Sequence, residues 1–93
     1  MVLLEDRNND LYIIKVEKWR NYQYRTEKIA ITNALDFAEK AGHPIKIIKY
    51  NAYYNIIYDY AIAYPDGHVE YFDEDKIIEK HEKEKEYREA IAM

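Results

Sequence analysis

The sequence of 93 residues contains no cysteine and no serine, and each absence excludes a class of chemistry. Without cysteine there are no disulfides, no thiolate metal sites and no cysteine nucleophile. Without serine, Thr26 and Thr32 are the only aliphatic hydroxyls, so a catalytic triad would need a threonine variant. The two glycines, Gly42 and Gly67, stand alone, which excludes a glycine-rich phosphate-binding loop.

Long apolar runs are also missing, so no segment is expected to span a membrane. The first ten residues, MVLLEDRNND, lack the basic and apolar regions of a secretory signal. Nearly half of the residues are apolar and a third are charged, which is typical of a folded protein. We therefore expect one intracellular domain that spans residues 1–93.

The net charge of −4 conceals an asymmetry between the two halves of the chain. Residues 11–49 carry eight basic and four acidic side chains, whereas residues 50–93 carry five basic and eleven acidic ones. An acidic surface in the second half would repel phosphate and favour a basic protein partner. The alternative interpretation is that these charges only solvate the exterior.

Tyrosine is the abundant residue, and six of the eleven tyrosines lie within residues 50–64. From position 54 to 64 the pattern has a period of two, which predicts a strand with a large aromatic side and a small side. The small side comprises Asn55, Ile57, Asp59, Ala61 and Ala63. We expect it to face a helix, which would leave the four tyrosines of the large side as an exposed protein-binding patch: Tyr54, Tyr58, Tyr60 and Tyr64. The alternative is that these tyrosines form the core.

Two helices are predicted. Thr26 caps a helix over 27–41 with an apolar stripe rich in alanine, and Gly42 followed by Pro44 ends it. Asp73 caps a second helix over 74–90, whose apolar stripe is thin, so its far end should fray or contact a partner.

Strands are predicted at 11–18, 45–50, 54–64 and 68–72, with a further short one at 2–5. Residues 19–25 fit either a strand or a loop. The turn Pro65-Asp66-Gly67 makes the last two strands an antiparallel hairpin. The predicted fold class is α+β, a mostly antiparallel sheet of four to five strands in the order ββαβββα. The first helix packs on one face, and the C-terminal second helix is partly exposed.

Other residues offer further candidate sites. The aromatic and basic side chains of Trp19, Arg20, Tyr22, Tyr24 and Arg25 have the composition of a surface that binds single-stranded nucleic acid. Because the chain has an acidic net charge, nucleic-acid binding is less favoured than binding of a protein partner. Asp59 either marks a site or pairs with Lys46 or Lys49. The three histidines match no metal signature, and we expect neither a metal nor a cofactor.

In composition the chain resembles small proteins of phages and archaeal viruses: it is rich in Ile, Tyr, Lys and Glu and poor in Gly. This resemblance implies a protein that binds and blocks a host factor, such as a defence nuclease. We therefore expect a non-enzymatic binding protein, whose partner is an unidentified protein or a second copy of the chain. The alternative is a binder of single-stranded nucleic acid.

Overall fold

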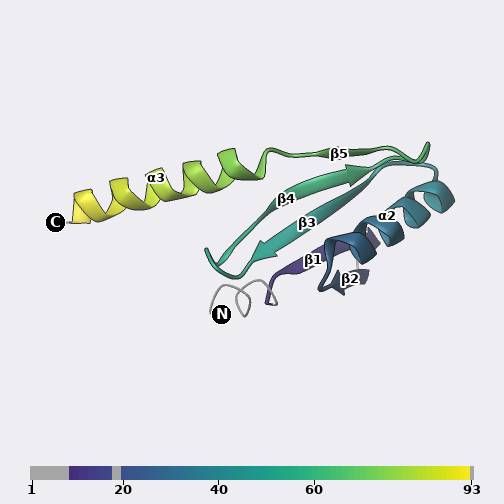
Figure 1. The fold of residues 1–93 in the computed structure, drawn as a ribbon, viewed down its shortest axis with the longest axis horizontal. Helices are drawn as coiled ribbons and strands as arrows, with labels where there is room; N and C mark the ends of the chain where they lie inside the picture. The colour runs from purple at the N-terminus through teal and green to yellow at the C-terminus, as the bar shows by residue number, and fades with distance from the viewer. Residues whose placement is uncertain (1–8, 18–19, 93) are drawn as a thin grey trace.

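A computed structural model describes residues 9–17 and 20–92 and shows an α+β fold. Five antiparallel strands form one sheet in the order β2-β1-β3-β4-β5 (Figure 1). In chain order the elements are β1 (Leu11–Glu17), β2 (Arg20–Tyr24), α2 (Glu27–Ala41), β3 (Ile45–Asn51), β4 (Ile56–Ala63), β5 (Val69–Tyr71) and α3 (Glu74–Ala92). The predicted order ββαβββα is confirmed. None of the helices in the described part is long and apolar enough to cross a lipid bilayer.

The first described strand, β1, lies where a strand was predicted at 11–18. The strand predicted at 2–5 lies outside the described residues. The second strand is instead Arg20–Tyr24, which the sequence left undecided, and it pairs antiparallel with β1. Its Tyr22 and Tyr24 lie opposite Ile14 and Tyr12, on the side of the sheet that packs against α2. Cross-strand aromatic and β-branched pairs of this kind stabilise a sheet.

Helix α2 forms and packs as its sequence predicts (Figure 1). The Thr26 side chain accepts a hydrogen bond from the Ile29 N–H, and Gly42 ends the helix with φ of 73°. Every fourth residue from Ala30 to Ala38 is an alanine, and all three are fully buried. Because alanine is small, the helix can lie close to the isoleucines of β1 and β3.

A β-bulge in β4 changes which side of the sheet its residues face. The β3–β4 register shifts between Ile47 and Ile48, which leaves Tyr60 of β4 as an extra residue. Tyr58 before the bulge and Ala61 after it therefore face the same side of the sheet, although they are three positions apart. The strict alternation predicted from position 54 to 64 is wrong, because one inserted residue reverses the phase of the pattern.

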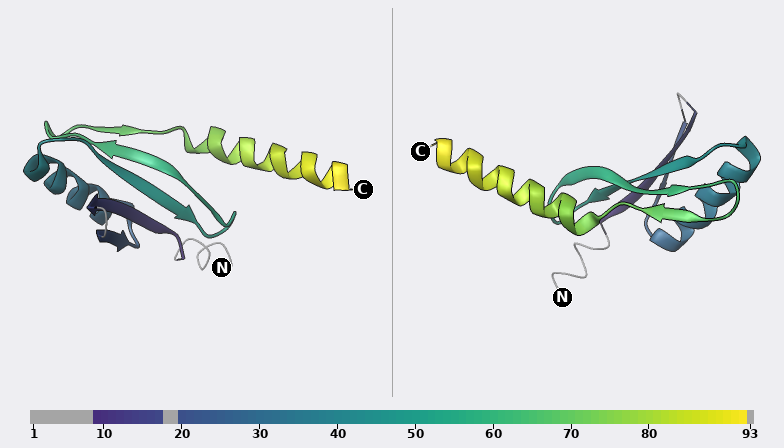
Figure 2. Two further views of the ribbon diagram at one scale, coloured as in Figure 1. Left: turned by 180° about the vertical axis from the view of Figure 1, so that it is seen from behind. Right: turned by 90° about the horizontal axis from the view of Figure 1, so that it is seen from above.

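The bulge decides what is buried under α2. Ala61 and Ala63 face the helix as predicted and are fully buried. Tyr58 and Tyr60 lie on that same side, and Tyr58 is only 9% exposed. Ile57, expected to face the helix, lies on the opposite side and is 65% exposed. In the described part of the chain, no helix covers that opposite side (Figure 2).

Helix α3 leaves the body of the molecule. The predicted hairpin of β4 and β5 is confirmed, and the Asp73 side chain then caps α3 by accepting from the Lys76 N–H at 3.1 Å. Both views in Figure 2 show α3 extending beyond the end of the sheet. The molecule consequently measures 52 × 29 × 25 Å, with a radius of gyration of 15.4 Å.

Candidate binding surface

A buried polar network joins α3 to the sheet. Lys49 follows Ile45 and Ile47 along the covered side of β3, but it lies beyond the end of α2. Its Nζ is 2.6 Å from the Glu74 Oε2 in the first turn of α3 and 3.9 Å from the Asp10 Oδ2. Since a buried ammonium group is costly unless it is paired, the ion pair between Lys49 and Glu74 holds the first turn of α3 against the sheet.

Tyrosines enclose the same lysine. The Lys49 Nζ lies 5.4 Å from the ring centroid of Tyr12 and 5.2 Å from that of Tyr60. The Tyr58 hydroxyl donates to Glu74 and accepts from the Asn51 amide at 3.1 Å. Burial raises the pKa of Tyr58 well above its ordinary value, and the hydrogen bond to Glu74 raises it further.

The cation of the network is held in its charged form. Burial alone lowers the pKa of Lys49, but the hydrogen bond to Glu74 and the neighbouring charges outweigh that effect, so the pKa lies above its ordinary value. Burial also raises the pKa of Tyr60, with a second contribution from Glu27 at the start of α2. Both helices thus direct a first-turn carboxylate toward this network. Its polar atoms already have partners, so its chemistry serves to position the helices.

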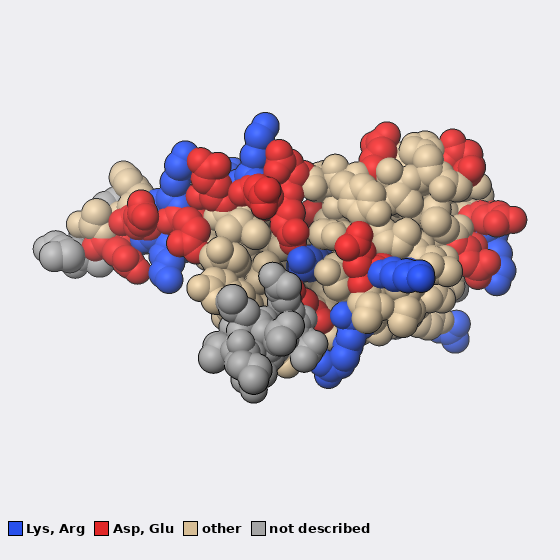
Figure 3. All heavy atoms as spheres, in the orientation of Figure 1, with Lys and Arg blue, Asp and Glu red and all other residues tan. Residues whose placement is uncertain are grey.

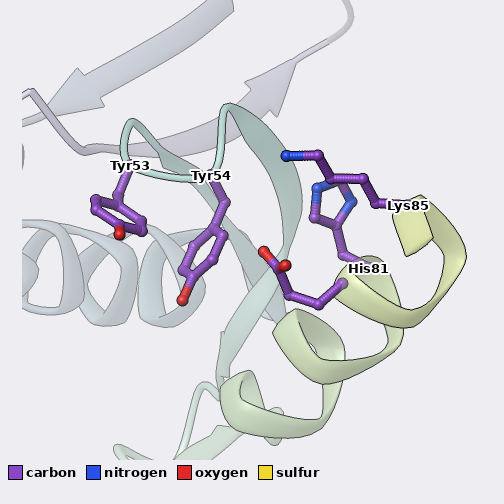
Figure 4. Close-up of a pocket in the computed structure, with 5 residues that line it drawn as sticks. Tyr53, Tyr54, His81 and Lys85 are labelled. Atoms are coloured by element: carbon purple, nitrogen blue, oxygen red, sulfur yellow. The ribbon is translucent and has the colours of Figure 1, made fainter. Parts of the chain in front are cut away.

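An open groove lies beside this network, between the sheet and α3. One part, of about 450 Å³, is lined by Tyr53, Tyr54, His81, Glu82 and Lys85. In Figure 4 the two tyrosines extend from the β3–β4 turn on one side, and His81 and Lys85 of α3 lie on the other. The adjoining part, of about 360 Å³, is lined by Ile56, Ile57, Tyr58, Ile77, Lys80, His81 and Glu84. Because His81 lines both parts, we treat them as one surface, the β4–α3 groove.

Exposed apolar and aromatic side chains distinguish this groove. Ile57 is 65% exposed and Tyr53 is 60% exposed, while the rings of Tyr53 and Tyr54 meet edge to face at 4.8 Å. The groove also contains two acidic and two basic side chains of α3, and none of the four forms an ion pair with a described residue: Lys80, Glu82, Glu84 and Lys85. Side chains in this state are available to pair with a partner.

The four tyrosines predicted to form one patch are separated. Tyr54 and Tyr58 line the two parts of the groove, although the Tyr58 hydroxyl is directed to the buried network. Tyr60 packs against the core. Tyr64 stacks on His68 at 4.2 Å, at the far end of the hairpin. A contiguous exposed patch of all four is therefore a wrong prediction, and the bulge at Tyr60 is the physical reason.

The alternative nucleic-acid set is not brought onto one open surface. Trp19 lies outside the described residues. The ring of Tyr22 lies 5.2 Å from Phe37 of α2, and Tyr24 packs against the core. Arg20 and Arg25 are exposed at the two ends of β2. The described aromatic side chains of this set therefore face α2, where bases could not stack on them.

The isolated ionisable residues have ordinary neighbours. Asp59 lies on the side away from α2 and pairs with Lys46 at 3.3 Å, which confirms one of its two predicted interpretations. The His43 Nδ1 is 3.1 Å from the Pro44 carbonyl oxygen, and the His68 Nδ1 is 2.5 Å from the Asp66 Oδ1. In residues 9–17 and 20–92, no three acidic or histidine side chains are arranged to hold a metal ion.

Sequence reasoning missed most residues of the β4–α3 groove. The sequence NAYYN at 51–55 predicts a turn that leads into the strand expected at 54–64, yet large aromatic side chains at Tyr53 and Tyr54 are unusual where turns favour small polar residues. That departure was the available signal. Comparisons of the chain with protein families, with curated proteins and with solved structures found no match.

Proposed function

We propose that this chain is a small, non-enzymatic binding protein that receives a protein partner in the β4–α3 groove. The observation that carries the proposal is the exposure of Tyr53 and Ile57 along a groove whose second wall is a projecting helix. Exposed apolar and aromatic side chains that are gathered in one place commonly mark a protein interface.

The charge distribution supports a basic partner. All residues of the groove belong to the second half of the chain, residues 50–93, which carries eleven acidic and five basic side chains. Figure 3 shows charged side chains crowded along α3, whereas the centre of the body is largely uncharged on that face. The groove lining is balanced, with two acidic and two basic side chains, so the acidic excess of the surrounding second half of the chain supplies the negative field. Such a field steers a basic protein toward the groove and repels the phosphates of nucleic acid.

The assignment as non-enzymatic rests on the chemistry of the side chains. The buried cluster around Lys49 uses its polar atoms for internal hydrogen bonds, and cysteine and serine nucleophiles are lacking. The compositional resemblance to viral proteins suggests what binding would accomplish. In that case occupation of the groove would block a host factor, such as a defence nuclease.

Matched isoleucine variants test the proposal. The immobilised chain would be exposed to an extract of its source cells, and the captured proteins would be identified by mass spectrometry. Ile57→Ser should reduce capture of the specific partner several-fold, whereas Ile29→Ser should preserve it, because Ile29 is 52% exposed but lies on α2 outside the groove. Equal capture by both variants, or recovery of nucleic acid in place of a protein, would reject the groove as the binding surface.

A further inference from the structure

One edge of the sheet is only half paired. Strand β4 extends from Ile56 to Ala63, but β5 and the Phe72 N–H that follows it bond only to residues from Tyr60 onward. The chain then turns away into α3, and no described strand adjoins the outer edge of residues 56–59. Because β5 ends early, the first half of β4 borders the groove with an open edge.

Hydrogen bonds to β5 fix the direction of the backbone groups after the bulge. The Tyr64 N–H donates to the His68 carbonyl, and the Phe72 N–H donates to the Tyr60 carbonyl, each at 3.0 Å. Between these two bonds, Ile62 lies opposite Glu70 and must direct its own backbone groups to β5. Its neighbours on either side therefore direct theirs to β3.

The pairing with β3 gives the orientation of the backbone N–H and C=O groups of β4 on the other side of the bulge. Ala61 directs its backbone groups to β3, where it is paired with Ile47. Strand β3 has no bulge, so the backbone groups of Lys49, two positions after Ile47, are again directed to β4. Lys49 is paired with Tyr58, whose backbone groups are therefore directed to β3. Ile57, adjacent to Tyr58, must then direct its N–H and C=O outward, into the β4–α3 groove. This edge has backbone donors and acceptors that no described strand uses, and an added strand can pair with them.

From this arrangement we infer that the β4–α3 groove binds an extended segment of a basic partner protein, which adds to the free edge of β4 as a further strand. The inference rests on the proposed function and specifies how the partner is held. Backbone hydrogen bonds to Ile57 would supply affinity, and side chains of the segment would alternate between the groove and solvent. The free edge of four residues is about 13 Å long and so accommodates a segment of about four or five residues.

The walls of the groove define the chemistry of that segment. Ile57 of the strand and Ile77 of the helix provide apolar contacts, so every second side chain of the segment should be apolar. The unpaired carboxylates of Glu82 and Glu84 can pair with lysine or arginine at the remaining positions, whereas the unpaired Lys80 and Lys85 can pair with acidic residues. The excess of eleven acidic over five basic side chains in residues 50–93 favours the basic residues. A second copy of the chain fits less well, because its own β4 edge is flanked by its own α3.

A random ten-residue peptide display library, selected on the immobilised full chain, provides the probe. Enriched peptides should have apolar residues at alternate positions with lysine or arginine between them. The strongest peptide would then be synthesised with and without N-methyl groups on alternate amides. Methylation on the pairing side should weaken binding about tenfold or more, since it removes backbone donors and leaves the side chains unchanged.

Two substitutions at one exposed position distinguish the contribution of the backbone to binding from that of the side chain. Ile57→Pro and Ile57→Ala both remove the isoleucine side chain, but only proline removes the outward N–H. Binding should be lost with Ile57→Pro and should fall only several-fold with Ile57→Ala. If Ile57→Pro fails to fold, hydrogen exchange of the Ile57 amide in the unaltered chain decides the matter, because saturation with the peptide must protect it.

The outcomes distinguish the two proposals. Enriched peptides with a helical apolar spacing that still require Ile57 would overturn strand addition and retain the groove as a protein-binding site. A library that yields no peptide, or peptides that bind groove variants normally, would overturn both. Concentration-dependent dimers that Ile57→Pro disrupts would assign the edge to a second copy, which overturns the inference of a separate partner.

Discussion

The two helices of this protein differ in how they are held. Helix α2 has fifteen residues, a cap at each end and three fully buried alanines packed on the sheet. Helix α3 is longer, at nineteen residues, yet none of its described side chains is buried. Glu74, in its first turn, attaches it to the sheet through Lys49 and Tyr58.

Helix α2 therefore forms part of the core, whereas the surface of α3 remains available to bind a partner. The alanine stripe of α2 is buried against the sheet from Ala30 to Ala38, so most of the apolar surface of this helix serves the core. Helix α3 depends on surface pairs such as Glu79 with Lys83 at 2.9 Å, each of which contributes about 0.3 to 0.5 kcal/mol. The free energy of unfolding therefore depends little on the projecting part of α3, which can form one wall of a binding groove.

The largest expected effect tests the covered side of the sheet. Ile47 is fully buried beneath α2, so Ile47→Ala should reduce the free energy of unfolding by about 2 to 5 kcal/mol. Urea denaturation followed by circular dichroism measures the loss. The matched change Ile78→Ala on α3 should cost less than about 1 kcal/mol, since this residue is only partly buried. Equal losses would contradict the division between the helices.

The second prediction concerns the attachment of α3. Glu74→Ala leaves the Lys49 ammonium buried with only the more distant Asp10 carboxylate, so we expect a loss of about 3 kcal/mol. The double variant Lys49→Met with Glu74→Leu removes both charges and should recover most of that loss. Thermal denaturation of the three proteins provides the comparison. If the single and double variants melt together, the ion pair is not what positions α3.

A third prediction follows from the raised pKa of Tyr58. The folded protein retains the phenol proton at a pH where the unfolded chain loses it, so this contribution to stability is complete below about pH 10 and is lost as pH rises above it. Unfolding free energies measured from about pH 9 to about pH 11 should therefore decline. Tyr58→Phe should make the decline shallower. Tyr87→Phe, at an exposed position of α3, should leave the slope unchanged.

The smallest effect is expected at the far end of α3. Ending the chain after His81 should change the free energy of unfolding by less than about 1 kcal/mol, because the removed residues bury little apolar area. Hydrogen exchange on the full chain sharpens the comparison. Amides beyond His81 should exchange with little protection, whereas that of Ala34 should exchange only through global unfolding. Strong protection of the last turns in a monomer would reveal contacts that the free helix lacks.

The sequence predicted the elements that depend on local chemistry. Thr26 and Gly42 bound α2, and Gly67 with φ of 99° lies in the turn of the hairpin, because caps and turns are determined by a few adjacent residues. The face of the tyrosine strand could not be predicted, since the bulge at Tyr60 arises only when β4 pairs with β3.

The β4–α3 groove could not be predicted from the sequence for a related reason. Its two walls, near Tyr53 and near His81, are almost thirty positions apart in the chain. They meet only because β5 ends early and α3 departs at a particular angle. The local indications were the predicted tyrosine patch, of which Tyr54 and Tyr58 line the groove, and the aromatic pair Tyr53 and Tyr54 in a segment with turn composition.

The projecting helix also alters how the molecule moves through solution. A compact chain of 93 residues would have a radius of gyration of about 12 Å, whereas this one has 15.4 Å. Helix α3 alone accounts for about 28 Å of length. Rotational diffusion should therefore be anisotropic, and a monomer should elute from a sizing column ahead of compact proteins of the same 11.3 kDa mass. Light scattering, which reports mass independently of shape, distinguishes such a monomer from a true dimer.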